Sequence, residues 1–185
     1  MQELFADARE RMGKAVDSVR REFAKIRTGK ATVSLLDGVR VEYYGSTVPL
    51  KQVANISVPE ARLLVVQPWD KKVLGDVEKA IMQADLGLNP SNDGNLIRVP
   101  IPPLTEERRK ELVRHVHKLA EEGRIAVRNV RRDVNEALKQ KQQAGEISED
   151  EFHRAHDKTV QDLTDENIRE IDQALAAKEK ELLEV

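Results

Sequence analysis

Cysteine is absent from this 185-residue sequence, aromatic residues are scarce, and no apolar run is long. Without cysteine, the chain can form no disulfide, thiol nucleophile or cysteine-ligated metal site, which suits the reducing cytoplasm. No stretch approaches the roughly 18 apolar residues of a membrane span. The acidic first residues lack the apolar block of a signal peptide. We therefore expect a cytoplasmic protein without a membrane partner.

Charged residues, in contrast, are abundant. They make up 35% of the chain, whereas aromatic residues make up 3%. This composition is typical of a helical bundle rather than a sandwich or barrel. The net charge is only −2, so any basic surface must be local and offset by acids elsewhere. Net charge therefore argues neither for nor against binding to nucleic acid.

Three segments carry apolar residues at the three- and four-residue spacing of an amphipathic helix. They span residues 4–26, 112–137 and 152–182. None could bury its apolar stripe alone, so they predict an elongated three-helix bundle. A generic coiled coil fits this pattern equally well. The stripes comprise Leu4, Ala8, Met12, Val16, Val19, Phe23 and Ile26; Leu112, Val116, Leu119, Val127, Val130, Val134 and Ala137; and Phe152, His156, Val160, Leu163, Asn167, Ile171, Leu175 and Leu182.

The ends of these helices carry recognisable signals. The first stripe stops at Thr28-Gly29, where glycine can adopt the left-handed conformation that closes a helix. Thr105 is a suitable N-cap for the second helix, which we expect to continue to Gln143. Ser148 stands three residues before Glu151, the spacing of a capping box. A short turn joins the last two helices, so they should be antiparallel neighbours.

The segment between the first two helices has a different pattern. Val39, Val41 and Tyr43 alternate with polar residues as in a strand, and residues 63–66 and 96–99 are short apolar runs. A short amphipathic helix is predicted between those runs, ending at the glycine and proline of residues 86–90. The sequence thus predicts an α+β protein. Residues 1–30 and 105–185 would form the bundle, and residues 31–104 would form an inserted small β/α/β domain.

Two links connect these predicted domains, Thr28-Gly29-Lys30 and Pro102-Pro103-Leu104. They should lie side by side if the first helix ends where the second begins. Glycine would make one link flexible, and the proline pair would stiffen the other. The pair of links therefore predicts a hinge of limited freedom.

A row of arginines follows the second helix. Arg124, Arg128 and Arg131 are spaced i, i+4 and i+7 and so share a face, with Arg132 beside them. No acid lies between Gly123 and Arg132. Arginine suits phosphate recognition, so the row indicates an RNA-binding surface. The alternative is an ordinary charged helix face paired with a neighbouring helix. No aromatic residue is near in sequence, which favours backbone contacts over base stacking.

A second basic set lies near the predicted hinge, where neighbouring acids offer ordinary surface pairing as the alternative. It comprises Arg27, Lys30, Arg108, Arg109, Lys110 and Arg114.

No enzyme site is evident. His153 and His156 lie near Asp157, but their spacing is not that of a zinc-protease motif, and packed or solvated histidines are the favoured interpretation. There is no phosphate-binding glycine loop and no coherent catalytic set. We expect no catalytic residue, metal or cofactor. A structural adaptor without RNA affinity and a histidine-metal hydrolase stay as alternatives. Tyr44 is a candidate for exposure to a partner.

Several strings resemble one family, the ribosome recycling factors. They are KIRTGKA at 25–31, SLLDG at 34–38, VEYYG at 41–45, DLGLNP at 85–90, IRVPIPPLTEERRK at 97–110, AVRNVRRD at 126–133 and EISED at 146–150. The strings are long, ordered and spread over nearly the whole chain. The resemblance implies an L-shaped, tRNA-like monomer that does no chemistry itself. With elongation factor G and its GTP hydrolysis, such a protein splits post-termination ribosomes and frees mRNA and tRNA.

The resemblance also implies roles for residues. Arg131 is the first candidate for a contact with large-subunit rRNA, with Arg128 beside it and Arg132 and Arg124 on the same helix. Arg27, Lys30 and Arg109 are candidates at the hinge end. Related sequences often carry arginine where this chain has Lys30, and lysine keeps the charge but loses the bidentate fork.

Overall fold

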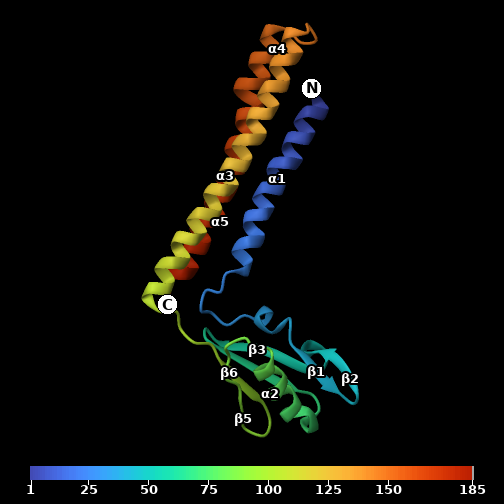
Figure 1. The fold of residues 1–185 in the computed structure, drawn as a ribbon, viewed down its shortest axis with the longest axis vertical. Helices are drawn as coiled ribbons and strands as arrows, with labels where there is room; N and C mark the ends of the chain where they lie inside the picture. Colours follow the sequence, from blue (N-terminus) through green and yellow to red (C-terminus); the bar gives the residue numbers. More distant parts are fainter. Residues whose placement is uncertain (185) are drawn as a thin grey trace. The chain divides into compact units, whose positions relative to one another are not determined.

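The computed structural model describes residues 1–184, which fall into two compact units (Figure 1). One unit combines Met1–Arg27 with the chain from Glu106 onward, and the other is Thr28–Thr105. The first unit is helical and the second combines strands with a short helix. The expected α+β fold is confirmed. None of the described helices is long and apolar enough to cross a membrane.

The helical unit is a three-helix bundle. Its helices are α1 (Gln2–Lys25), α3 (Glu106–Gln143) and a third arm of α4 (Glu149–Arg154), η4 (Ala155–Val160) and α5 (Gln161–Leu183). Each of α1, α3 and α5 packs on the other two. The 38 residues of α3 extend about 57 Å at 1.5 Å per residue. The buried stripes are Ala8, Met12, Val16, Val19 and Phe23; Leu112, Val116, Ala120, Gly123, Val127, Val130, Val134 and Leu138; and Leu163, Thr164, Asn167, Ile171, Leu175 and Leu182.

The first helix ends earlier than its apolar stripe suggested. Its last residue is Lys25, and Ile26 already has extended backbone angles, φ −80° and ψ 121°. Gly29 does have a positive φ of 78°, but it lies in the link beyond the helix rather than at its cap. The apolar side chain of Ile26 therefore misled the sequence-based boundary.

The turn between α3 and α4 follows the predicted signals. Gly145 has φ 73° and its N–H donates to Gln142, while the N–H of Glu146 donates to Lys141, which is the Schellman pattern. Ser148 and Glu151 then form the expected capping box. The Glu151 N–H donates to Ser148 Oγ at 3.2 Å, and the Ser148 N–H donates to Glu151 Oε2 at 2.8 Å.

The third arm contains a π-helical segment, η4, that the sequence did not reveal. Its buried residues are Ala155 and Val160, five positions apart. A π turn contains more residues than an α turn. The residues that face the bundle are therefore spaced five apart here instead of three or four. His156, expected on the apolar stripe, is therefore turned out of the seam, and its side chain is 40% exposed.

The small unit contains two antiparallel sheets. Strands β1 (Arg40–Tyr43) and β2 (Ser46–Pro49) form a hairpin. The second sheet has the order β3-β4-β6-β5, from β3 (Ala54–Glu60), β4 (Leu63–Pro68), β5 (Ser91–Asn92) and β6 (Ile97–Pro100). Helix α2 (Leu74–Gln83) follows β4, and short 3-10 turns lie at η1 (Val33–Leu36), η2 (Leu50–Gln52) and η3 (Lys71–Val73).

One apolar core holds this unit together. Val41 of β1, Leu64 and Val66 of β4, and Ile97 and Val99 of β6 are fully covered, and α2 adds its own buried face. The predicted strands near residues 39–44, 63–66 and 96–99 and the predicted helix are present. Strands β2, β3 and β5 were not predicted. Strands β2 and β5 are short, and most residues of β3 are exposed, although Ala54, Ile56 and Val58 alternate with polar residues.

The two links meet on the small unit. A Cβ on Gly29 would lie 3.3 Å from Leu104 Cγ, so the first link passes against the second. Gly29 combines this close approach with a left-handed φ, two properties that favour glycine. Thr28 is buried, whereas Pro102 and Pro103 are exposed.

Gly123 of α3 lies where both other long helices pack closely against α3. A Cβ there would overlap Val19 Cγ2 of α1 and lie 3.2 Å from Ile171 Cδ1 of α5. Glycine normally weakens a helix interior. Here its missing side chain lets α1 approach α3, so the helices gain contact that a larger residue would prevent.

Replacing Gly123 with alanine should destabilise the bundle. Val19 is β-branched and cannot swing aside easily, so overpacking should cost about 1–3 kcal/mol and outweigh the helix-propensity gain. At roughly 2–4 °C per kcal/mol, thermal unfolding followed by circular dichroism should show a lower Tm.

Gly13→Ala is the matched control. Gly13 lies inside α1, and a Cβ there would meet nothing within 4 Å. This variant should be more stable by about 0.5–1 kcal/mol. Equal stabilisation in both variants would contradict the close packing at Gly123.

Candidate nucleic-acid interface

Two arginines of α3 have no partner in the described part of the chain. Within residues 1–184, neither Arg131 nor Arg132 makes an ion pair or side-chain hydrogen bond. Arg132 is exposed and Arg131 is half-buried. The adjacent acid, Asp133, is paired instead with Arg11 of α1, with 2.6 Å between Arg11 Nη2 and Asp133 Oδ2. Two guanidinium groups are thereby left available to an external anion.

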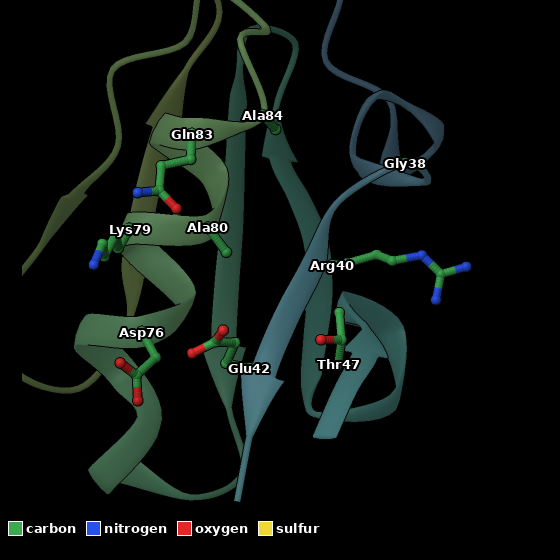
Figure 2. A pocket seen from close by; sticks show the side chains of 9 residues that line it. All are labelled: Gly38, Arg40, Glu42, Thr47, Asp76, Lys79, Ala80, Gln83 and Ala84. Carbon is green, nitrogen blue, oxygen red and sulfur yellow. The ribbon is translucent and has the colours of Figure 1, made fainter. Parts of the chain in front are cut away.

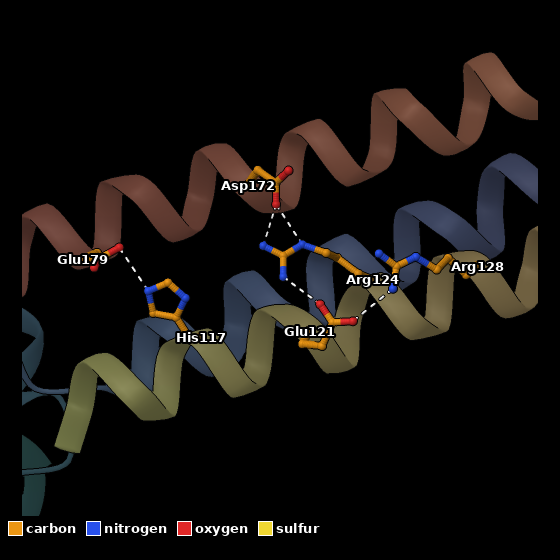
Figure 3. A network of polar contacts seen from close by, with 6 residues as sticks. All are labelled: His117, Glu121, Arg124, Arg128, Asp172 and Glu179. Atoms are coloured by element: carbon orange, nitrogen blue, oxygen red, sulfur yellow. Dashed lines mark hydrogen bonds and ion pairs between the residues drawn. The ribbon is translucent and has the colours of Figure 1, made fainter. Parts of the chain in front are cut away.

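Arg124, expected to reach solvent, does not do so freely. Its side chain is only 19% exposed and lies between Glu121 of its own helix and Asp172 of α5, as Figure 3 shows. Arg124 Nη2 is 2.7 Å from Asp172 Oδ1, and Nη1 is 2.9 Å from Glu121 Oε2. The segment from Gly123 to Arg132 contains no acid, but the fold places Glu121 and Asp172 beside Arg124. Arg124 joins α3 to α5.

Arg128 is intermediate between these cases. Its Nη1 lies 3.0 Å from Glu121 Oε1, but its side chain is 46% exposed. Hydrogen bonds from Arg124 and then Arg128 lower the pKa of Glu121, so this acid stays charged and neutralises both in part. An exposed pair of this kind is weak, about 0–1 kcal/mol. Arg128 can therefore exchange Glu121 for a stronger anion.

The unpaired arginines border a hollow between α3 and the α4–η4 segment. Its volume is about 480 Å³. Four cationic side chains line it, Arg128, Arg131, Arg132 and Lys139, against one acid, Glu136. The other lining residues are Asn129, Asn135, Phe152 and His156. The surface is locally basic although the protein carries a net negative charge.

Two rings lie in this hollow, contrary to the expectation that no aromatic residue would be near the arginines. Phe152 and His156 stack with ring centroids 5.5 Å apart and planes inclined by 29°. Their positions are 20 or more residues from the arginines in sequence, and the turn after α3 folds them back. The only sequence signal was their place at the start of the third helix.

The basic residues near the links are less well gathered. Arg27 is exposed just beyond α1, and Arg109 is half-buried near the start of α3. Lys30 is half-buried in the other unit. Arg108 and Lys110 are ion-paired with Glu111 and Glu106 in the first turns of α3. These pairs are of the ordinary surface kind that was the alternative to RNA binding for these residues.

The histidines lie in hydrogen-bonded pairs or at the surface. His156 Nδ1 is 2.6 Å from Asp157 Oδ1, and His117 Nε2 is 3.2 Å from Glu179 Oε2 (Figure 3). Among the residues that the structure describes, no three His, Asp or Glu side chains are grouped to hold a metal ion.

The small unit has a second hollow, between the β1–β2 hairpin and α2 (Figure 2). Glu42 and Asp76 are near this space together with Lys79, whereas Arg40 extends away from Asp76 and Lys79. The charges are mixed, so this hollow has no clear preference for an anion or a cation.

The small unit exposes two aromatic side chains, Tyr44 in the β1–β2 turn and Trp69 just after β4. Tyr44 is 71% exposed and Trp69 is 68% exposed. The Tyr44 hydroxyl donates to Asp70 Oδ2 at 2.5 Å, and this bond raises the pKa of Tyr44. Tyr44 has φ 47°, an uncommon conformation for a residue other than glycine. The exposure considered for Tyr44 is present in the structure.

Comparison with known proteins identifies the family. The family model described as ribosome recycling factor matches residues 19–183. A ribosome-recycling factor of Desulforamulus reducens is 56% identical over 185 residues, covering both chains fully. That of Thioalkalivibrio sulfidiphilus is 59% identical over 179 residues, covering 97% of this chain and 96% of the relative.

Solved structures agree. A solution structure of the ribosome recycling factor matches with a TM-score of 0.74 and 48% identity, covering 100% of this chain and 97% of that one. A second structure matches with a TM-score of 0.63. It is described as models for the T. thermophilus ribosome recycling factor and the E. coli elongation factor G bound to the E. coli post-termination complex. Its identity is 48%, and 98% of each chain is covered. The chain belongs to the ribosome recycling factor family.

Proposed function

We propose that this protein recycles ribosomes after termination. It would bind the post-termination ribosome through large-subunit rRNA and, with elongation factor G and GTP, split the subunits and release mRNA and tRNA. The observation that carries this proposal is the unpaired state of Arg131 and Arg132 in a chain of this family. A relative bound to a post-termination complex beside elongation factor G supports the same partners.

The docking step follows from arginine chemistry. A guanidinium group makes bidentate hydrogen bonds with phosphate oxygens. Among the described residues, Arg131 and Arg132 pair with no acid that must be released first, so binding a phosphate breaks no ion pair there. Arg128 would give up only an exposed contact with Glu121. Arg124 would remain a brace between α3 and α5. Arg27, Lys30 and Arg109 are further candidates for rRNA contact.

The chain itself would perform no chemistry in this role. The protein would act in the cytoplasm as a monomer without a cofactor, and its partner would hydrolyse GTP. The bundle, closely packed at Gly123, is suited to transmit force without bending. The small unit would receive the push from elongation factor G.

The two links are proposed as the hinge. They comprise Thr28, Gly29 and Lys30 on one side and Pro102, Pro103 and Leu104 on the other. Gly29 lies against Leu104, so the links are held together where they leave the small unit. Two adjacent connections restrict rotation more than a single one would. The exposed proline pair stiffens the second link.

A structural adaptor without RNA affinity is the alternative. An apolar helix interface would survive high salt. Phosphate docking instead releases counterions, so its affinity falls steeply as salt rises. Co-sedimentation with ribosomes over a salt series therefore separates the two functions.

Arg131→Ala should weaken ribosome binding about tenfold or more at low salt, because a hydrogen bond to a charged group contributes roughly 1.5–3 kcal/mol. Its circular dichroism spectrum and Tm should match those of the unchanged protein, since Arg131 has no internal partner. Co-sedimentation with 70S ribosomes gives the affinity.

Arg169→Ala is the matched control for charge. Arg169 is exposed on α5 and has no ion pair within the described residues. This variant should bind ribosomes nearly as the unchanged protein does. The assignment of Arg131 would be wrong if both variants bound equally.

Pro102→Ala combined with Pro103→Ala tests the hinge. Both prolines are exposed, so their loss should leave the fold intact while loosening one link. Ribosome binding should stay within about twofold, a difference under roughly 0.5 kcal/mol. Subunit splitting with elongation factor G and GTP, followed by light scattering, should be slower per bound molecule. Normal splitting per bound molecule would exclude a mechanical role for the proline pair.

A further inference from the structure

The hollow beside the free arginines contains more than phosphate docking requires. Phosphate contacts need only cations and N–H donors. Here the half-buried rings of Phe152 and His156 stack at the same surface. A volume of about 480 Å³ falls in the roughly 300–1,000 Å³ range of small-ligand sites.

The π-helical segment is what brings His156 to this hollow. In a regular α-helix His156 would follow Phe152 by one turn into the apolar seam. Instead Ala155 occupies the seam, and His156 faces the space beside α3. Single π turns occur frequently at functional sites. Asp157 binds His156 Nδ1 at 2.6 Å, which leaves Nε2 without a partner in the described chain.

Asn135, which also lines the hollow, carries a buried polar atom without a hydrogen-bond partner among the described residues. Its Oδ1 is buried and accepts no hydrogen bond from the described residues. Buried polar atoms are nearly always satisfied, and exceptions call for a functional explanation. No bond through Oδ1 fixes the amide, so it can rotate to present either its N–H₂ group or its carbonyl oxygen to a ligand in the hollow.

We propose that this hollow binds one unpaired nucleotide of RNA, with its base stacked on the Phe152–His156 pair and its phosphate held by Arg131 and Arg132. The amide of Asn135 meets the edge of the base. The inference rests on the proposed function and deepens it, because it names the RNA element that the docking face takes. A looped-out or single-stranded base fits this geometry, whereas a base within a duplex cannot reach the rings.

The test uses fluorescence of 2-aminopurine, which is quenched when the base stacks. The probe is a single-stranded RNA of ten nucleotides with one internal 2-aminopurine, titrated with the full-length protein at low salt. We expect quenching on binding, and much weaker binding by the same RNA in a duplex. Equal binding by the duplex, or no quenching in the bound oligonucleotide, would overturn the proposal.

Phe152→Leu keeps the apolar packing but removes the ring, and Phe152→Tyr keeps the ring. Stacking on an aromatic side chain contributes about 5- to 150-fold to affinity per base. The leucine variant should therefore lose quenching and bind the oligonucleotide about fivefold or more weakly. The tyrosine variant should behave as the unchanged protein, and equal melting of the two variants shows that both are folded.

Ribosome co-sedimentation separates this inference from the proposed function. If Arg131→Ala impairs ribosome binding while Phe152→Leu quenches and binds normally, the nucleotide site is wrong and phosphate docking stands. If neither variant affects ribosome binding and quenching is absent, both fail. Loss of quenching in Phe152→Leu, together with weaker ribosome binding that the tyrosine variant restores, supports the site.

Discussion

The close approach of three helices at Gly123 is the constraint on which the rest of the helical unit depends. With no side chain at this position, α3 receives Val19 from α1 and Ile171 from α5 at the same level. This contact fixes the rotation of α3 about its axis. It therefore decides which α3 side chains face the neighbouring helices and which face solvent.

The division of the arginines follows from that rotation. Arg124, next to Gly123, is directed toward Asp172 of α5, whereas Arg131 and Arg132, two turns further on, pair with no acid among the described residues. Asp133 is held on the other side by Arg11 of α1. One helix thus uses part of its positive charge to brace the bundle, while Arg131 and Arg132 make no ion pair in the described part of the chain. A negative net charge and a locally basic surface coexist because neighbouring acids such as Asp133 and Asp172 are paired with other arginines.

Much of this arrangement could be predicted from the sequence, since the periodicity of apolar residues indicated the long helices and the capping signals located the α3–α4 turn. Local patterns failed where tertiary contacts decide. Asp172 is 48 residues from Arg124, and no spacing rule could have paired them. Ile26 continued the apolar stripe but lies outside α1. Short exposed strands such as β5 have no apolar pattern to detect.

The π-helical segment η4 is another feature that local sequence patterns did not predict. In sequence, His156 continues a perfect stripe, and an α-helix would bury it. The structure instead buries Ala155 and Val160, which places His156 beside Phe152 at the basic hollow. A π turn weakens regular helical hydrogen bonding, so its presence in an otherwise regular helix needs a compensating benefit. Here the segment places Ala155 and Val160 in the seam and leaves the His156 ring at the hollow that Arg131 and Arg132 also line.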